Sequence, residues 1–328
     1  MPNVTAVDGG GAPRRTRVAV ALGGGGARGY AHIGVLEVLD DRGYDVVSVA
    51  GSSMGALIGG LYAARGLDAY SEWVRTLTHR DVLRLFDLSP RAPGAIRAEK
   101  IFARVADIVG DVRIEDLPVP FTAVATDLMT GEERWFQDGP VDAAIRASAA
   151  LPGFMTPVVI DGRLLADGGL TNPLPLAPTV GAGADLTVAV VVAGRHRTAV
   201  PTPRRSGEHR HVRGVIGPRL AALRGSAQAG ATAPPAAELT EAVFEALPPG
   251  LGLLDVMDLS LEAVRTSVLR HTLAACPPDA LITIPRSSCR TLDFHKAEEM
   301  IALGRRLAGD SLDRVEGVAP TRAAGEGR

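Results

Sequence analysis

The chain has 328 residues, of which 46% are hydrophobic and 22% charged, and its formal net charge is -2. This length favours one α/β domain with insertions, and so small a net charge gives no drive toward nucleic acid, so we expect no nucleic-acid partner. The two cysteines, Cys276 and Cys289, have no zinc-ligand spacing and form no disulfide framework, which favours a reducing compartment.

The hydropathy of the chain indicates where it resides. No apolar run approaches the roughly 18–20 residues that a membrane span needs. Residues 1–16 are polar and glycine-rich and lack the apolar centre of a signal peptide, so we expect a disordered tail and a cytoplasmic location. If the substrate is a lipid, the protein must reach the inner face of the membrane peripherally, from the aqueous side.

The first elements form a repeating pattern. The apolar run at 18–22 predicts a buried strand, and residues 30–41 have apolar side chains at helical spacing. A second buried strand at 46–50 and a second helix at 54–64 follow. Strand, helix, strand, helix in under fifty residues predicts a parallel right-handed unit and an α/β fold.

The rest of the chain predicts further strands, helices and unstructured segments. Residues 66–116 are mostly amphipathic helix and are a candidate cover for the site, whereas 194–250 is a low-complexity insertion rich in Arg, Pro and Gly. The tail from 309 to 328 is expected to be disordered. The remaining expected elements are strands at 121–128, 156–160, 186–192 and 280–284 and helices at 255–275 and 294–308.

The segment Gly51-Ser52-Ser53-Met54-Gly55 fits the G-x-S-x-G pattern of a nucleophile elbow. That chemistry needs a serine on a sharp strand-to-helix turn, where flanking glycines avoid collisions with the neighbouring backbone. The match lies between a predicted strand and a predicted helix, which is the setting the motif requires. The alternative is an ordinary strand-to-helix turn with a helix-capping serine.

An earlier turn, GGGGARG at 23–29, admits two interpretations. Gly24, Gly26 and Gly29 satisfy the G-x-G-x-x-G of a dinucleotide site, but the second strand ends without the carboxylate that would hold a ribose. Alternatively, the amides of Gly24, Gly25 and Gly26 converge as an oxyanion hole at a helix start. Arg28 then either adds positive charge or braces the loop.

A serine nucleophile needs a proton acceptor. None of the seven histidines lies in a predicted strand-end turn, so a Ser-His-Asp triad is not favoured. Asp167 is the better candidate, because it follows a short apolar run and precedes Gly168 and Gly169, which allow another backbone to approach closely. The alternative is an ordinary turn aspartate.

Three segments together resemble the patatin-like phospholipase family, and most closely its bacterial members related to neuropathy target esterase. They are G-G-G-A-R-G at 24–29, G-S-S-M-G at 51–55 and D-G-G at 167–169, in that family's order and approximate spacing. The likeness covers about 17–194 and 251–308. Further matching segments are A-H-I-G-V-L (31–36), S-A-A-L-P-G (148–153), N-P-L-P (172–175), ITIP (282–285) and LDF (292–294).

The resemblance implies a three-layer α/β/α fold with a mainly parallel sheet, within a hydrolase domain spanning 17–308. It also implies a serine lipid acyl hydrolase that needs no metal or cofactor. By position, Ser53 is the nucleophile, Asp167 its base, and the Gly24–Gly26 amides with Arg28 the oxyanion loop. Two departures are Ser52, where threonine is common, and the FMTPV segment at 154–158.

Other functions stay open at this point. One is a carboxylesterase or thioesterase that acts on soluble acyl groups, and another is a non-catalytic lipid-binding module of the same fold. The arginine-rich stretch 195–224 within the insertion is expected either to contact anionic membrane lipid or to be a solvated linker.

Overall fold

The computed structural model describes residues 14–85, 98–152, 155–193 and 252–322. The chain divides into two units, residues 1–196 with 257–328 and residues 197–256, and the fold below is that of the first. The expected insertion at 194–250 and most of the expected N-terminal tail lie outside the described residues. Residues 14–16 correct that tail prediction, because the Asp45 amide donates to the Thr16 carbonyl and Arg14 pairs with Asp185.

A mixed sheet forms the centre of this unit, in the order β5-β6-β3-β2-β1-β7-β8, with β4 paired to β3. Its middle, from β3 through β2, β1 and β7 to β8, is parallel, whereas β4, β5 and β6 pair in antiparallel fashion. The strands are β1 (Arg17–Leu22), β2 (Asp45–Ser52), β3 (Phe121–Asp127), β4 (Glu133–Phe136), β5 (Val158–Ile160), β6 (Arg163–Asp167), β7 (Leu186–Ala193) and β8 (Ala280–Pro285).

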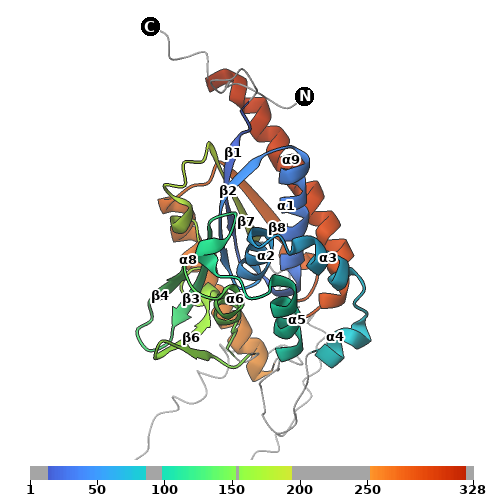
Figure 1. Ribbon diagram of the computed structural model, residues 1–328, viewed down its shortest axis with the longest axis vertical. Helices are drawn as coiled ribbons and strands as arrows, with labels where there is room; N and C mark the ends of the chain where they lie inside the picture. The colour runs from blue at the N-terminus through green and yellow to red at the C-terminus, as the bar shows by residue number, and fades with distance from the viewer. Residues whose placement is uncertain (1–13, 86–97, 153–154, 194–251, 323–328) are drawn as a thin grey trace, which may run out of the picture. The chain divides into compact units, whose positions relative to one another are not determined.

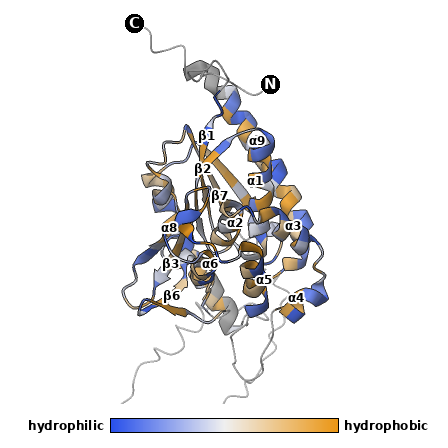
Figure 2. Cartoon of the chain, in the orientation of Figure 1, coloured by the Kyte–Doolittle hydropathy of each residue, from blue (hydrophilic) through white to orange (hydrophobic). Residues whose placement is uncertain are grey.

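Helices cover both faces of the sheet, which confirms the α/β/α prediction (Figure 1). Alternate residues of β1 divide the core between the two faces. Val18, Val20 and Leu22 join the cluster under α1 (Ala31–Asp41), α2 (Met54–Ala63) and α9 (Ala297–Arg322). Ala21 packs on the other side with Leu269 of α8 (Leu253–Ala275). The central strands are largely hydrophobic, and polar residues gather on the outer helices (Figure 2).

In its described residues, the predicted helical segment at 66–116 contains three α-helices, α3 (Leu67–Arg75), α4 (His79–Leu85) and α5 (Glu99–Val109). Each buries apolar residues: Tyr70 and Val74 of α3 and Val105 of α5 join the main core cluster, whereas Val82 of α4 lies in a smaller cluster with Ala98. A fourth helix, α6 (Val141–Ser148), follows β4 and packs against β3 and α2.

The C-terminal tail prediction is wrong for residues 309–322, because α9 continues to Arg322. Its polar composition conceals an apolar stripe in which Ala308 and Leu312 are fully buried. Arg42, at the end of α1, fastens the same helix through ion pairs to Asp313 at 2.7 Å and Glu316 at 3.2 Å. Packing against α1 therefore stabilises this helix beyond residue 308, where the polar sequence predicts a disordered tail.

Candidate active site

Ser53 occupies a tight turn between β2 and α2, as the elbow pattern predicts. Its φ of 57° is in the left-handed region, which a non-glycine residue enters only when its surroundings hold it there. Gly55 makes room for the turn, since a Cβ there would lie 2.0 Å from the Leu22 carbonyl oxygen. The serine itself is half-buried and lines a cavity.

The glycine turn lies directly against this serine. A Cβ on Gly24 would stand 3.3 Å from the Cβ of Ser53. The Gly24 amide donates to the Pro173 carbonyl at 3.3 Å, whereas the Gly25 and Gly26 amides have no backbone acceptor among the described residues. Gly25 and Gly26 are thus better placed than Gly24 to donate to an anion, at the start of the 3-10 helix η1 (Gly26–Tyr30).

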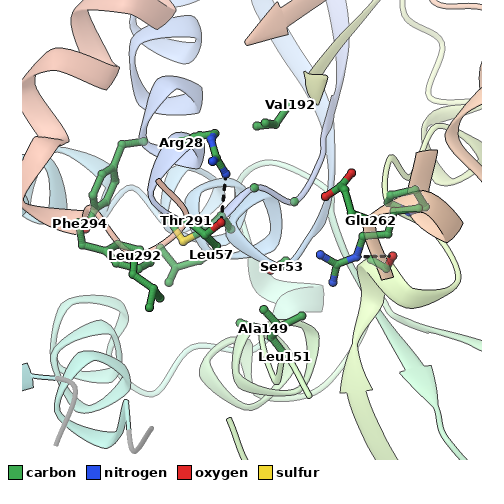
Figure 3. A pocket seen from close by; sticks show the side chains of 18 of the residues that line it. Arg28, Ser53, Leu57, Ala149, Leu151, Val192, Glu262, Thr291, Leu292 and Phe294 are labelled. Atoms are coloured by element: carbon green, nitrogen blue, oxygen red, sulfur yellow. Dashed lines mark hydrogen bonds between the residues drawn. The ribbon is translucent and has the colours of Figure 1, made fainter. Parts of the chain in front are cut away.

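Two side chains hold the glycine turn in place. Arg28 donates from Nε to the Arg286 carbonyl at 2.9 Å and from Nη1 to Thr291 at 3.2 Å, so of its two expected roles the bracing one is favoured (Figure 3). His32 is fully buried, with Nε2 2.8 Å from the Gly23 carbonyl oxygen. Burial lowers the pKa of this imidazole to about 4, so the ring is neutral and donates to Gly23.

Asp167 ends β6 and is completely buried. Its Oδ1 accepts from the Gly169 amide at 2.8 Å, while Oδ2 has no hydrogen-bond partner among the described residues. Gly168 is required here, because a Cβ would lie 1.9 Å from the Val124 carbonyl oxygen. Thr126 donates to the Asp167 carbonyl at 2.9 Å and fixes the turn from β3.

The sheet brings the elbow and the aspartate turn together across one intervening strand. Ser52 of β2 lies opposite Val124 of β3, and Asp167 of β6 lies opposite the next residue of β3, Ala125. Side-chain contacts close the gap: Ser52 Oγ donates to the Asn172 carbonyl at 2.6 Å and would stand 3.1 Å from a Cβ on Gly168. Segments more than one hundred residues apart therefore meet where β2 and β6 end.

Ser148 is a supporting residue to which the sequence analysis assigned no role. Its buried hydroxyl accepts from the Ser53 amide at 3.0 Å and donates to the Val124 carbonyl at 2.5 Å. It therefore ties the elbow to β3. The signal was present, since Ser148 begins the S-A-A-L-P-G segment, but nothing in that string shows which backbone groups the hydroxyl meets.

Arg265 is a second such residue, on α8. Its Nε donates to the Gly169 carbonyl at 3.1 Å, and its Nη2 lies 3.4 Å from Asp167 Oδ1. From sequence it is predicted only to lie in the helix at 255–275, because helical periodicity does not show which distant turn a side chain reaches.

A cavity of about 790 Å³ opens beside Ser53 and the glycine turn. Two walls of different chemistry enclose it. The apolar wall comes mainly from α3, α4, α5 and the segment before α9, and includes Tyr70, Trp73, Leu77, Val82, Phe102 and Phe294. The α8 wall is mixed: it carries Glu262, Arg265, Thr266 and Arg270 beside the apolar residues Leu259, Ala263 and Leu269.

In the view of Figure 3, Leu292 and Phe294 lie on one side of Ser53 and Glu262 on the other. The predicted cover at 66–116 contributes much of the apolar wall, and no histidine of the described segments lines the cavity.

Among the described residues, no helix combines the length and the apolar character needed to cross a bilayer.

Comparison with known proteins places the chain in a family. The family model for patatin-like phospholipase matches residues 20–180. An uncharacterized NTE family protein of Mycobacterium tuberculosis is 47% identical over 332 aligned residues, which cover 92% of this chain and 92% of the relative.

Two animal relatives are much longer than this chain. Human patatin-like phospholipase domain-containing protein 6 is 35% identical over 193 residues, covering 56% of this chain and 14% of its own length. Neuropathy target esterase sws of Drosophila melanogaster is 35% identical over 188 residues, covering 55% and 13%. The chain therefore belongs to the patatin-like phospholipase family, among its members related to neuropathy target esterase.

Proposed function

We propose that this protein is a serine lipid acyl hydrolase that cleaves carboxylic esters through Ser53 and Asp167. Membership of a phospholipase family supports a lipid hydrolase in general. The observation that carries the finer proposal is the large cavity with Ser53 and the glycine turn on its wall and apolar side chains beyond them. About 790 Å³ is within the range of small-molecule sites, and an apolar lining suits an acyl chain.

The chemistry is acyl transfer in two steps. Asp167 Oδ2 takes the proton of the Ser53 hydroxyl as Ser53 Oγ attacks the ester carbonyl carbon, and the amides of Gly25 and Gly26 donate to the resulting oxyanion. Collapse breaks the bond to the alcohol, which leaves with the proton from Asp167. Water then attacks the acyl-serine, giving up a proton to the same aspartate. The bond from the acyl carbon to Ser53 Oγ breaks, Oγ takes the proton back from Asp167, and the fatty acid leaves.

Asp167 suits the base role because of what surrounds it. One carboxylate oxygen, Oδ1, is occupied by the Gly169 amide, while the other is buried without a partner in the described residues. Native structures rarely leave a buried polar atom unpaired, and such atoms are found at sites of chemistry. The adjacent Ser52–Asn172 and Ser148–Ser53 hydrogen bonds limit the movement of both turns.

A panel of defined lipids tests the proposal. The purified chain is incubated with a phospholipid, the corresponding lysophospholipid, a triacylglycerol, an acyl thioester and a short water-soluble ester, and the products are identified by mass spectrometry. We expect fatty acid from the long-chain esters and none from Ser53→Ala. Preference for the short ester or the thioester would favour the soluble-substrate alternative, and an inert parent chain would favour a non-catalytic lipid-binding module.

A further inference from the structure

The carboxylate of Asp167 meets a cation that the acyl-transfer steps above do not use. The Asp167 side chain is 1% exposed, and Arg265 forms an ion pair with it, with Nη2 3.4 Å from Oδ1. The same guanidinium donates from Nε to the Gly169 carbonyl at 3.1 Å. One planar group thus touches both ends of the turn Asp167-Gly168-Gly169.

The two contacts differ in strength. A charge-assisted N–H···O bond is typically about 2.7–2.9 Å, so the 3.4 Å contact to Oδ1 is long and acts chiefly as a nearby charge. The Nε bond to the Gly169 carbonyl is of ordinary length and fixes the guanidinium against the turn. Arg265 is itself largely buried, with 20% of its side chain exposed, so solvent screens this charge only partly.

The position of Arg265 in the chain makes the contact informative. It lies on α8, outside the segment 20–180 that matches the family model, and α8 also forms one wall of the cavity. A buried carboxylate without a compensating cation is costly, and the turn that carries it then tends to rearrange. Such a rearrangement would move Oδ2 away from the position that the proposed proton transfer needs.

We propose that Arg265 is a positioning residue for the base: it supplies the countercharge to the buried Asp167 carboxylate and holds Oδ1 aside, so that Oδ2 is left for the serine proton. The inference rests on the proposed function. It makes α8 part of the machinery for acyl transfer, in addition to its place in the cavity wall. The competing role, in which Arg265 only binds an anionic head group of the substrate, affects substrate affinity instead of turnover.

The experiment compares variants of the full chain on a neutral, phosphate-free short-chain ester, so that head-group binding plays no part. Arg265→Met removes the charge with little change in volume, and Arg265→Lys restores the charge without the planar Nε donor. The matched control is Arg163→Met. Arg163 lies on β6, the strand of Asp167, away from the cavity wall, and the change breaks its 3.1 Å ion pair to the buried Asp127 of β3.

We expect kcat of Arg265→Met to fall about tenfold to a hundredfold, the effect of losing a hydrogen bond to a charged group, with KM changed less than about threefold. Arg265→Lys should recover part of this loss, and Arg163→Met should keep the parent kcat even if it melts earlier. Millimolar guanidinium ion should partly restore Arg265→Ala, which a merely structural role would not allow.

Three results would overturn the inference: parent-level kcat in Arg265→Met, a change confined to KM, or a loss that follows the melting temperature and that neither lysine nor guanidinium restores. If Arg265→Met is insoluble, Arg265→Lys alone tests the inference. Its kcat should be severalfold lower than that of the parent. A parent-level kcat would show that contact with both the Gly169 carbonyl and Asp167 Oδ1 is not needed. A parent chain without esterase activity, or an active Ser53→Ala, would instead remove the proposed function, and this inference with it.

Discussion

Replacing Ser148 by alanine tests how the nucleophile turn is held. The change removes a hydroxyl that accepts from the Ser53 amide at 3.0 Å and donates to the Val124 carbonyl at 2.5 Å. A buried amide left without an acceptor costs about 1–3 kcal/mol. The left-handed backbone of Ser53 carries a strain energy of similar size, about 1–3 kcal/mol. The hydrogen bond from its amide to the Ser148 hydroxyl helps to keep the backbone in that conformation.

The two consequences are measured separately. Thermal unfolding of Ser148→Ala should begin about 2–12 °C below that of the parent, because about 1–3 kcal/mol is lost at about 2–4 °C per kcal/mol. Ester hydrolysis should fall at least tenfold in kcat, because a small displacement of the proposed nucleophile is costly. Thr179→Val is the control: it removes an equally buried hydroxyl, bonded to the Leu176 carbonyl, that does not line the cavity. An unchanged kcat in Ser148→Ala, or an equal loss in Thr179→Val, would refute this reasoning.

Three further predictions concern the cavity, pH and the membrane. Leu77→Trp adds bulk to the apolar wall, so hydrolysis of long-chain esters should fall several-fold relative to a short-chain ester; an unaltered chain-length profile would place the acyl chain elsewhere. Burial lowers the pKa of His32 to about 4 in the folded chain. Between about pH 6.5 and pH 4 the unfolded chain therefore binds a proton at this histidine and the folded chain does not, so the free energy of unfolding decreases as the pH falls through that range. The loss at pH 5 should be about 2 kcal/mol by denaturant titration and should largely disappear in His32→Asn; equal pH dependence in both proteins would contradict it. Deleting the arginine-rich stretch 195–224 should weaken sedimentation with anionic vesicles, at about 1 kcal/mol per basic residue near the surface, and equal binding would leave that stretch a linker.

Local pattern was enough to predict most of the fold. The alternation of short apolar runs and helical periods predicted β1, α1, β2 and α2 to within one or two residues. A parallel strand that is buried on both faces is a nearly continuous apolar run, so such strands can be recognised in the sequence. The strand β4 was missed, because it is four residues long at the antiparallel side of the sheet and only Phe136 in it is buried.

Local pattern failed where long-range packing decides the structure. The end of α9 looks polar, but its stability comes from α1 and from Arg42, more than 260 residues earlier in the chain. For the same reason, the motifs predicted Ser53 and Asp167 as site residues but not the side chains that hydrogen-bond or ion-pair with them. Ser148 and Arg265 contact Ser53 and Asp167 only because the sheet and α8 bring distant segments together.

The central claim is that Ser53 is a nucleophile activated by Asp167. The most direct measurement is the site and rate of covalent labelling by a fluorophosphonate probe, read by peptide mass spectrometry on the folded parent chain, Ser53→Ala and Asp167→Asn. Our account predicts a single adduct on Ser53, no adduct in Ser53→Ala, and labelling slowed at least a hundredfold in Asp167→Asn. Labelling at another residue, or at the parent rate in Asp167→Asn, would contradict it.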